Sequence, residues 1–242
     1  MENTTNLGRD DVGKLLFKLA LPAIIAQLVN VLYNIVDRIF IGRIPNGHIA
    51  MAGVGVSFPI IMIISAFSAL IGVGGAPLAA IKMGENNNDE AEKIMSNSFS
   101  VLVILGIVLT VGFMAFNEPI LWAFGASNET IGFAKDYLTI YLIGTVFVQI
   151  ALGMNPFINT QGFAKVGMVT IMIGAVINIV LDPVFIFGFN MGVKGAALAT
   201  ILAQIVSAVW ILVFLFGKKS VLKLKKKYLV PDFKIVLSII SL

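Results

Sequence analysis

Long apolar runs alternate with short polar segments along the whole chain. A helix needs roughly 20 mostly apolar residues to cross the hydrocarbon core of a membrane. Six stretches are long enough, and the pattern therefore predicts six spanning helices. They cover residues 15–44, 54–83, 98–116, 132–157, 166–189 and 193–217.

A seventh apolar run covers residues 234–242 and stops at the chain end. It would form roughly 14 Å of helix, about half of a bilayer core. We expect it to be the start of a seventh membrane helix, cut short by the end of the chain. The lysine-rich segment before it, residues 218–233, is expected to be a linker.

The composition agrees with a membrane protein. Only 12% of the residues are charged, whereas about 25% is usual in soluble domains. We therefore assign the chain to the all-α integral membrane class. It has no cysteine and a single histidine, His48, which excludes disulfides, thiolate metal sites and sites with several imidazoles.

Basic residues are distributed unevenly between the two predicted sides of the membrane. Cytoplasmic loops carry an excess of Lys and Arg. With the N-terminus inside, only Arg38, Arg43, Lys135 and Lys194 lie toward the outer side, and the other 13 of the 17 basic residues lie toward the inner side. This predicts a cytoplasmic segment 1–14, a membrane lobe 15–217 and a cytoplasmic linker.

Only two acidic residues fall inside the predicted spans, Asp37 and Asp182. An ionised side chain at the bilayer centre costs about 2.5–3.5 kcal/mol on insertion scales and usually has a function. Each aspartate lies seven residues before the outer end of its helix, and Thr200 lies seven residues after the outer start of another. The three residues are therefore expected at one depth.

Polar residues surround these positions at helical spacing. Their oxygens suit a hard cation such as Na⁺, and the carboxylates could equally hold a proton. We take Asp37, Asn178, Asp182 and Thr200 as the candidate cation site. The candidate cavity-lining residues from this spacing are Asn30, Tyr33, Asn34 and Gln204.

Five prolines lie inside the predicted spans, and two of them are close to the candidate site in sequence. Proline removes a backbone donor and frees the carbonyl four residues earlier, which bends a helix. Pro183 follows Asp182 directly, and Pro22 lies 15 residues before Asp37. Both are candidate bending points, although a static kink explains either one alone.

Four segments resemble the multidrug and toxic compound extrusion (MATE) family. The first runs from Asp37 through Phe40-Ile41-Gly42 to Pro59, and the second contains Asn155-Pro156-Phe157-Ile158 and Gln161-Gly162. The third is Asn178-Ile179-Val180-Leu181-Asp182-Pro183, and the fourth runs from Gly192 to Gln204. The resemblance adds Asn155, near the inner end of the fourth predicted span, to the candidate cavity-lining residues. Asn159 departs from the pattern, because relatives often carry arginine there.

The resemblance implies two six-helix lobes around a central cleft, of which this chain supplies the amino-terminal one. It further implies a prokaryotic plasma-membrane antiporter that exports organic cations and drugs in exchange for Na⁺ or H⁺, with no other cofactor and no nucleic acid partner. The missing lobe, or a second copy, would be needed to complete the cleft.

Four alternatives remain open from the sequence. Asp37 could merely pair with Arg38 or Arg43, and two intramembrane aspartates could belong to an aspartyl protease. A protease would place them in Tyr-Asp and Gly-x-Gly-Asp contexts, which this sequence lacks. The chain could also be a flippase for a lipid-linked precursor, or a lobe that does not transport.

Overall fold

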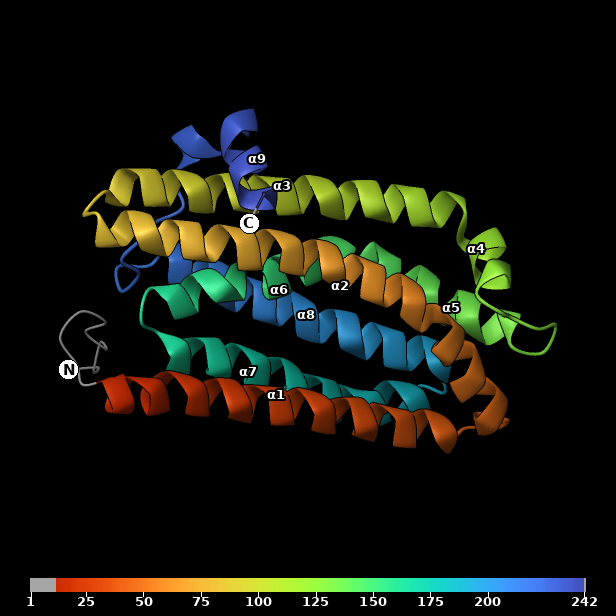
Figure 1. Ribbon diagram of the computed structural model, residues 1–242. Helices are drawn as coiled ribbons and strands as arrows, with labels where there is room; N and C mark the ends of the chain where they lie inside the picture. Colours follow the sequence, from red (N-terminus) through yellow and green to blue (C-terminus); the bar gives the residue numbers. More distant parts are fainter. Residues whose placement is uncertain (1–11, 242) are drawn as a thin grey trace.

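The computed structural model describes residues 12–241, with side chains from residue 20 onward. All regular structure in this part is helical, and the long helices run roughly parallel or antiparallel in one bundle (Figure 1). The elements are α1 (Val12–Gly42), α2 (Gly47–Gly84), α3 (Asn88–Ala115), α4 (Asn117–Ala123), α5 (Ile131–Ile143), α6 (Thr145–Thr160), α7 (Ala164–Pro183), a π-helix (Val184–Gly188), α8 (Val193–Phe216), a 3₁₀ turn (Lys226–Tyr228) and α9 (Phe233–Ile240).

The six predicted spans are present. Five helices are long and apolar enough to cross a membrane, and α5 with α6 gives a sixth span that bends by 61°. The bend replaces the continuous helix expected over 132–157, and it falls at Gly144, where Ile201 of α8 packs against the backbone. Residues 1–11 of the expected N-terminal segment, and Leu242, lie outside the described residues.

Two helices begin earlier than hydropathy predicts. α2 starts at Gly47 rather than residue 54, and α3 starts at Asn88 rather than residue 98. The first turn of α3 carries Asp89 and Glu90, and the Asn87 side chain accepts the Glu90 N–H at 3.2 Å. Acidic residues and an asparagine cap stabilise a helix N-terminus in water. α3 therefore extends beyond its apolar part.

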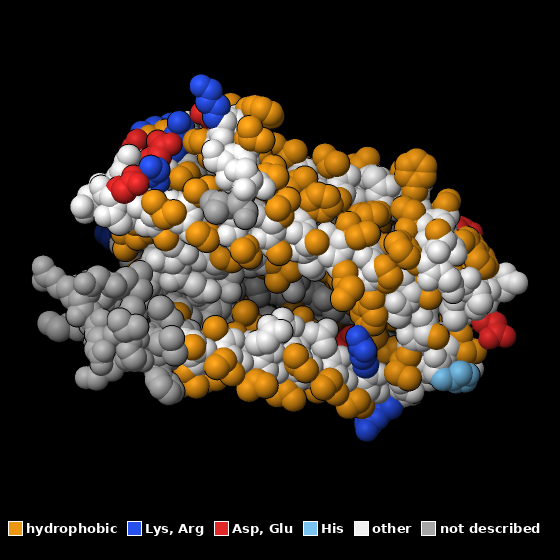
Figure 2. Space-filling view, viewed as in Figure 1, with side chains coloured by type: hydrophobic (Ala, Val, Ile, Leu, Met, Phe, Trp, Pro, Cys, Tyr) orange, Lys and Arg blue, Asp and Glu red, His pale blue; other side chains and the backbone are white. Residues whose placement is uncertain are grey.

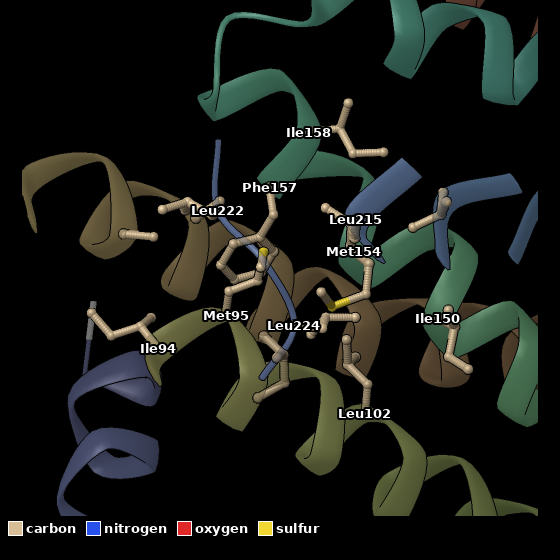
Figure 3. Packing of buried hydrophobic residues seen from close by; sticks show 14 of the residues in the cluster. Ile94, Met95, Leu102, Ile150, Met154, Phe157, Ile158, Leu215, Leu222 and Leu224 are labelled. Atoms are coloured by element: carbon tan, nitrogen blue, oxygen red, sulfur yellow. The ribbon is translucent and has the colours of Figure 1, made fainter. Parts of the chain in front are cut away.

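Buried apolar side chains form two clusters along the bundle. One lies near the end where residues 218–232 run, which we call the linker end, and its tightly packed members include Met95, Met154 and Phe157 (Figure 3). The other, around Ile60 and Leu138, lies toward the opposite end, where α4 is found, which we call the α4 end. In both clusters α2 packs directly on α6.

The lysine-rich linker lies on the start of α3 instead of extending into solvent. Lys225 forms ion pairs with Asp89 and Glu92, and its N–H donates to Ser96 Oγ at 3.2 Å. Leu222 and Leu224 are buried in the cluster at the linker end. Much of the positive charge of this segment is therefore balanced by the acidic first turns of α3.

A glycine contact between α2 and α6 gives a stability prediction. A Cβ at Gly72 would lie 2.8 Å from the carbonyl oxygen of Gly153, whereas a Cβ at Gly112 would meet nothing within 4 Å. Gly72→Ala should lower stability by about 1–3 kcal/mol, because two backbones must separate. Gly112→Ala should leave it unchanged or raise it by up to about 1 kcal/mol, through helix propensity. Thermal unfolding in detergent tests both, and equal melting temperatures would contradict this packing.

Candidate functional site

The candidate site lies where α1, α7 and α8 meet. α1 packs mainly on α7, and α7 packs on α8 (Figure 1). This brings the carboxyl group of Asp37, from α1, beside that of Asp182, from α7. Asp182 is fully buried. The two acidic residues of the predicted spans, 145 positions apart in sequence, are therefore neighbours.

The side-chain amide of Asn178 links Asp182 to Thr200. Asn178 Nδ2 donates to Asp182 Oδ1 and to Thr200 Oγ1, at 3.3 Å each. Asn178 lies one turn before Asp182 on α7, so both side chains point the same way. All four sequence-predicted cation-site residues are thus within one cluster.

Three oxygen atoms of this cluster have no hydrogen-bond partner among the described residues. They are Asp37 Oδ1, Asn178 Oδ1 and Asp182 Oδ2, and all three are buried. Buried acceptors without partners are costly, and adjacent carboxylates repel one another. A proton or a small hard cation bound between them would remove both costs. The donor set fits either one, since it offers only oxygen atoms.

The backbone after Asp182 is irregular in a way that positions α8. α7 ends at Pro183 and continues as a single π-helical turn, Val184–Gly188. Gly195, in the first turn of α8, packs directly on this turn, because a Cβ there would lie 2.7 Å from the backbone of Phe185. This close approach holds the start of α8, and with it Thr200, against α7.

A cavity of about 260 Å³ adjoins the cluster toward the linker end. Asn30, Tyr33, Asn155 and Gln204 line it, together with Asn178 and Thr200. A second hollow, of about 390 Å³, shares Asn155 with the first and is also lined by Pro22 and Asn159. Figure 2 shows an opening between α1 and α2 on this face of the bundle.

Asn34 differs from the other cavity candidates. Its side chain is exposed and is absent from the cavity lining. Its Nδ2 donates to the backbone oxygen of Asn30 at 2.7 Å and to Asn30 Oδ1 at 2.9 Å. Asn34 therefore fixes the Asn30 side chain, which does line the cavity.

Two tyrosines of α5 adjoin the site and were not singled out from the sequence. Tyr137 and Tyr141 are nearly fully buried and stack with ring centroids 6.3 Å apart. The Tyr137 hydroxyl lies beside Thr200, and its ring is close to Asp37. Their spacing of four residues within a predicted span was the available signal, but it does not show which helix they face.

Simple ion pairing does not explain Asp37. The Arg38 guanidinium lies over the ring of Phe58, 4.6 Å from its centroid. In the part of the chain with described side chains, neither Arg38 nor Arg43 forms a salt bridge. The carboxyl group of Asp37 is directed toward Asp182 instead.

Sequence comparison gives a consistent set of relatives. The family model described as MatE matches residues 22–184. The multidrug export protein MepA of Staphylococcus haemolyticus is 29% identical over 220 residues, which cover 91% of this chain and 48% of that protein. MepA of Staphylococcus aureus (strain NCTC 8325 / PS 47) is 26% identical, covering 93% and 49%. The chain spans about half the length of the curated relatives it matches.

The chain is also similar to about half the length of solved structures. A crystal structure of MATE in complex with MaD3S superposes with a TM-score of 0.90 at 29% identity, covering 98% of this chain and 53% of that one. A MOP superfamily transporter from Pyrococcus furiosus gives 0.89 at 30% identity, covering 98% and 52%. The fold of the described bundle is therefore that of one half of these transporters.

The unpaired oxygens predict a cation-dependent melting temperature. Replacing choline with Na⁺ should stabilise the purified protein, because a bound ligand adds RT ln(1 + [L]/Kd), about 2.7 kcal/mol at a hundredfold excess over Kd. Asp182→Asn should remove most of this increase. Asp136→Asn, a surface carboxylate paired with Lys194, should retain it. A Na⁺ effect that survives Asp182→Asn would place the ion elsewhere, and stabilisation by lowered pH alone would indicate a proton.

Proposed function

This chain belongs to the MATE family, and from that premise we propose that it is the amino-terminal lobe of a secondary antiporter. The antiporter would export organic cations and drugs in exchange for Na⁺ or H⁺. The family consists of transporters, and the named relatives are multidrug export proteins, so an intramembrane protease is set aside. The activity of a whole exporter is a proposal for this chain, because the match covers about half of each relative.

The observation that carries the proposal is the pair of the half-buried Asp37 and the fully buried Asp182, whose unpaired oxygens lie beside a polar cavity. Two negative charges in a low-dielectric site need a positive charge nearby. An inorganic cation or a proton, and an organic cation in the adjoining cavity, can each supply it. Because either cation alone supplies the positive charge that the site needs, binding of one favours release of the other. This competition is the requirement for exchange.

Coupling also needs two conformations with different affinity for the cation. Pro22 and Pro183 lie within the helices that carry the two aspartates, and the π-turn after Pro183 is a further irregular point. α1 is continuous through Pro22, whereas the regular helix of α7 breaks after Pro183, and broken transporter helices line substrate sites. We propose that bending at these points changes the distance between the two carboxyl groups, and so the affinity for the coupling ion.

A six-helix lobe provides one wall of a cleft. The exposed face of α1 is rich in apolar side chains, among them Leu28, Leu32 and Ile35. We propose that a second lobe, or a second copy of this chain, completes the cleft in a prokaryotic plasma membrane. In this arrangement, the linker end lies in the cytoplasm and the α4 end lies outside.

Export of ethidium tests the function. Cells that express the complete gene should export the dye, and an imposed gradient of either Na⁺ or H⁺ should drive it. Asp37→Asn should reduce the initial rate at least about tenfold, because it removes one of the two charges that bind the coupling ion. Asp136→Asn is the matched control and should export normally. Undiminished export by Asp37→Asn in protein that is correctly inserted would overturn the antiporter proposal.

Cysteine labelling tests the orientation, since the chain contains no cysteine of its own. Glu85→Cys lies at the linker end and Asn128→Cys at the α4 end, and both positions are exposed. In intact cells, a membrane-impermeant maleimide should label only Asn128→Cys. Glu85→Cys should react after permeabilisation. The reverse pattern would place the N-terminus outside.

A further inference from the structure

Four basic residues occupy the α4 end of the bundle, and they fall into two kinds. Lys135 and Lys194 are paired with acidic side chains, at Nζ–O distances of 2.8 and 3.4 Å. Arg38 and Arg43 form no ion pair and donate no hydrogen bond from their side chains within residues 20–241. Neither guanidinium group is neutralised by these residues, and of the two only Arg38 lines the apolar hollow formed with Met51 and Phe58.

Arg38 is held in a defined place even though it is unpaired. Its guanidinium lies over the ring of Phe58, 4.6 Å from the centroid. Such stacking occupies one face of the planar group and leaves the N–H donors at its edge free. A carboxylate can accept two of these N–H groups at once, and such bidentate pairs are among the strong, charge-assisted hydrogen bonds of arginine.

Open space lies on both sides of this side chain. One hollow, of about 180 Å³, is lined by Arg38, Met51, Gly55 and Phe58, with Ile41 and Val54. A Cβ built on Gly55 would meet nothing within 4 Å. A shallower hollow, of about 440 Å³, lies on the other side, toward Arg43. The free edge of the guanidinium thus borders space with apolar walls, where an aromatic group can pack.

The position of Arg38 along the membrane argues for a polar surrounding. It follows Asp37 within a predicted span, where an unpaired charge is costly unless it faces a water-filled cavity. Figure 2 shows basic side chains beside the opening between α1 and α2, with an acidic side chain next to them. This side of α1 therefore fits the wall of an aqueous path better than a lipid-facing surface.

Asp37 and Arg38 present opposite charges in neighbouring directions. Adjacent residues of an α-helix point about 100° apart. The Asp37 carboxyl group turns toward Asp182, and the Arg38 guanidinium turns toward Phe58 on α2. One turn of α1 therefore offers a negative group to a cationic part of a ligand and a positive group to an anionic part.

We propose that Arg38, stacked on Phe58, is an anion subsite that selects aromatic cargo carrying a carboxylate in addition to its cationic group. The proposal rests on the proposed export function and deepens it by naming the residue that recognises an anionic group on the cargo. In it, the carboxylate accepts N–H groups from the edge of the Arg38 guanidinium while the aromatic part packs on Met51 and Phe58. The cationic part is directed toward the acidic pair.

Two dyes that differ by one methyl ester test this subsite. Rhodamine 110 is a zwitterion with a free carboxylate, and rhodamine 123 is its methyl ester. Binding of both dyes to the transporter purified from its complete gene is measured by fluorescence anisotropy, for wild type, Arg38→Met, Arg38→Lys and Arg43→Met. Export of rhodamine 123 from cells is measured in parallel.

The expected result is specific to one dye and one residue. Arg38→Met should weaken the binding of rhodamine 110 about tenfold or more, as expected for a lost charge-assisted hydrogen bond. The same substitution should change the affinity for rhodamine 123 less than about twofold. Arg38→Lys should be intermediate, since lysine keeps the charge but not the planar fork. Arg43→Met removes the same charge from the same helix and should leave both dyes near wild type.

Three outcomes would overturn the subsite. They are a wild type that does not bind rhodamine 110, an equal loss for both dyes in Arg38→Met, and an equal loss of rhodamine 110 in Arg43→Met. The last two would indicate a general structural or electrostatic effect. Failure to export rhodamine 123, with the dye-specific binding intact, would count against the proposed export function and leave the subsite standing.

Discussion

The lobe is organised around the direct approach of two carboxyl groups, Asp37 and Asp182, in its interior. Like charges in a low-dielectric environment repel strongly, so this arrangement persists only if other groups hold it. α1 meets the rest of the bundle mainly through α7. The position of Asp37 therefore depends on this one helix pair, and a change in the charge of the site acts directly on the same contact.

The rest of the bundle gives the site a firm back wall. α8 is fixed to the π-turn by the close approach of Gly195, and the buried tyrosine pair of α5 closes the side beside Thr200. Further from the site, Ser68 on α2 donates to Gln149 on α6 at 2.8 Å, and Gln149 donates to the Ile64 carbonyl at 2.8 Å. Both side chains are fully buried, and a satisfied polar network at such a position rigidifies the helices that it joins.

The linker and α9 pack on the part of the bundle that α2 and α3 form. Asn97 of α3 donates to the Tyr228 carbonyl at 3.2 Å and accepts the Asp232 N–H at 2.5 Å. The hydrogen bond from the Lys234 N–H lowers the pKa of Asp232, so this carboxylate stays charged beside Lys93. The α9 backbone at Ile239 then packs directly on Gly74 of α2. α9 is therefore positioned by α2 and α3, while α1 stands on the opposite side of the opening.

The sequence by itself determined the membrane class, the six spans and the two acidic residues inside them. These follow from length, hydropathy and the cost of burying charge, which are properties of each segment alone. It also indicated that Asp37, Asp182 and Thr200 share one depth. The same reasoning placed the start of α3 too late, because its polar first turns carry no hydropathy signal. It also missed the first turns of α2.

Only the tertiary structure decided which side chains meet. The approach of Asp37 to Asp182, the stacking of Arg38 on Phe58 and the place of Tyr137 beside Thr200 all depend on how helices rotate and pack. The bend at Gly144 and the π-turn after Pro183 likewise lie at close contacts with α8, which the sequence of either segment alone does not show. Helical periodicity fixes which residues of one helix share a face, but the neighbour of that face is set by packing among helices far apart in the chain.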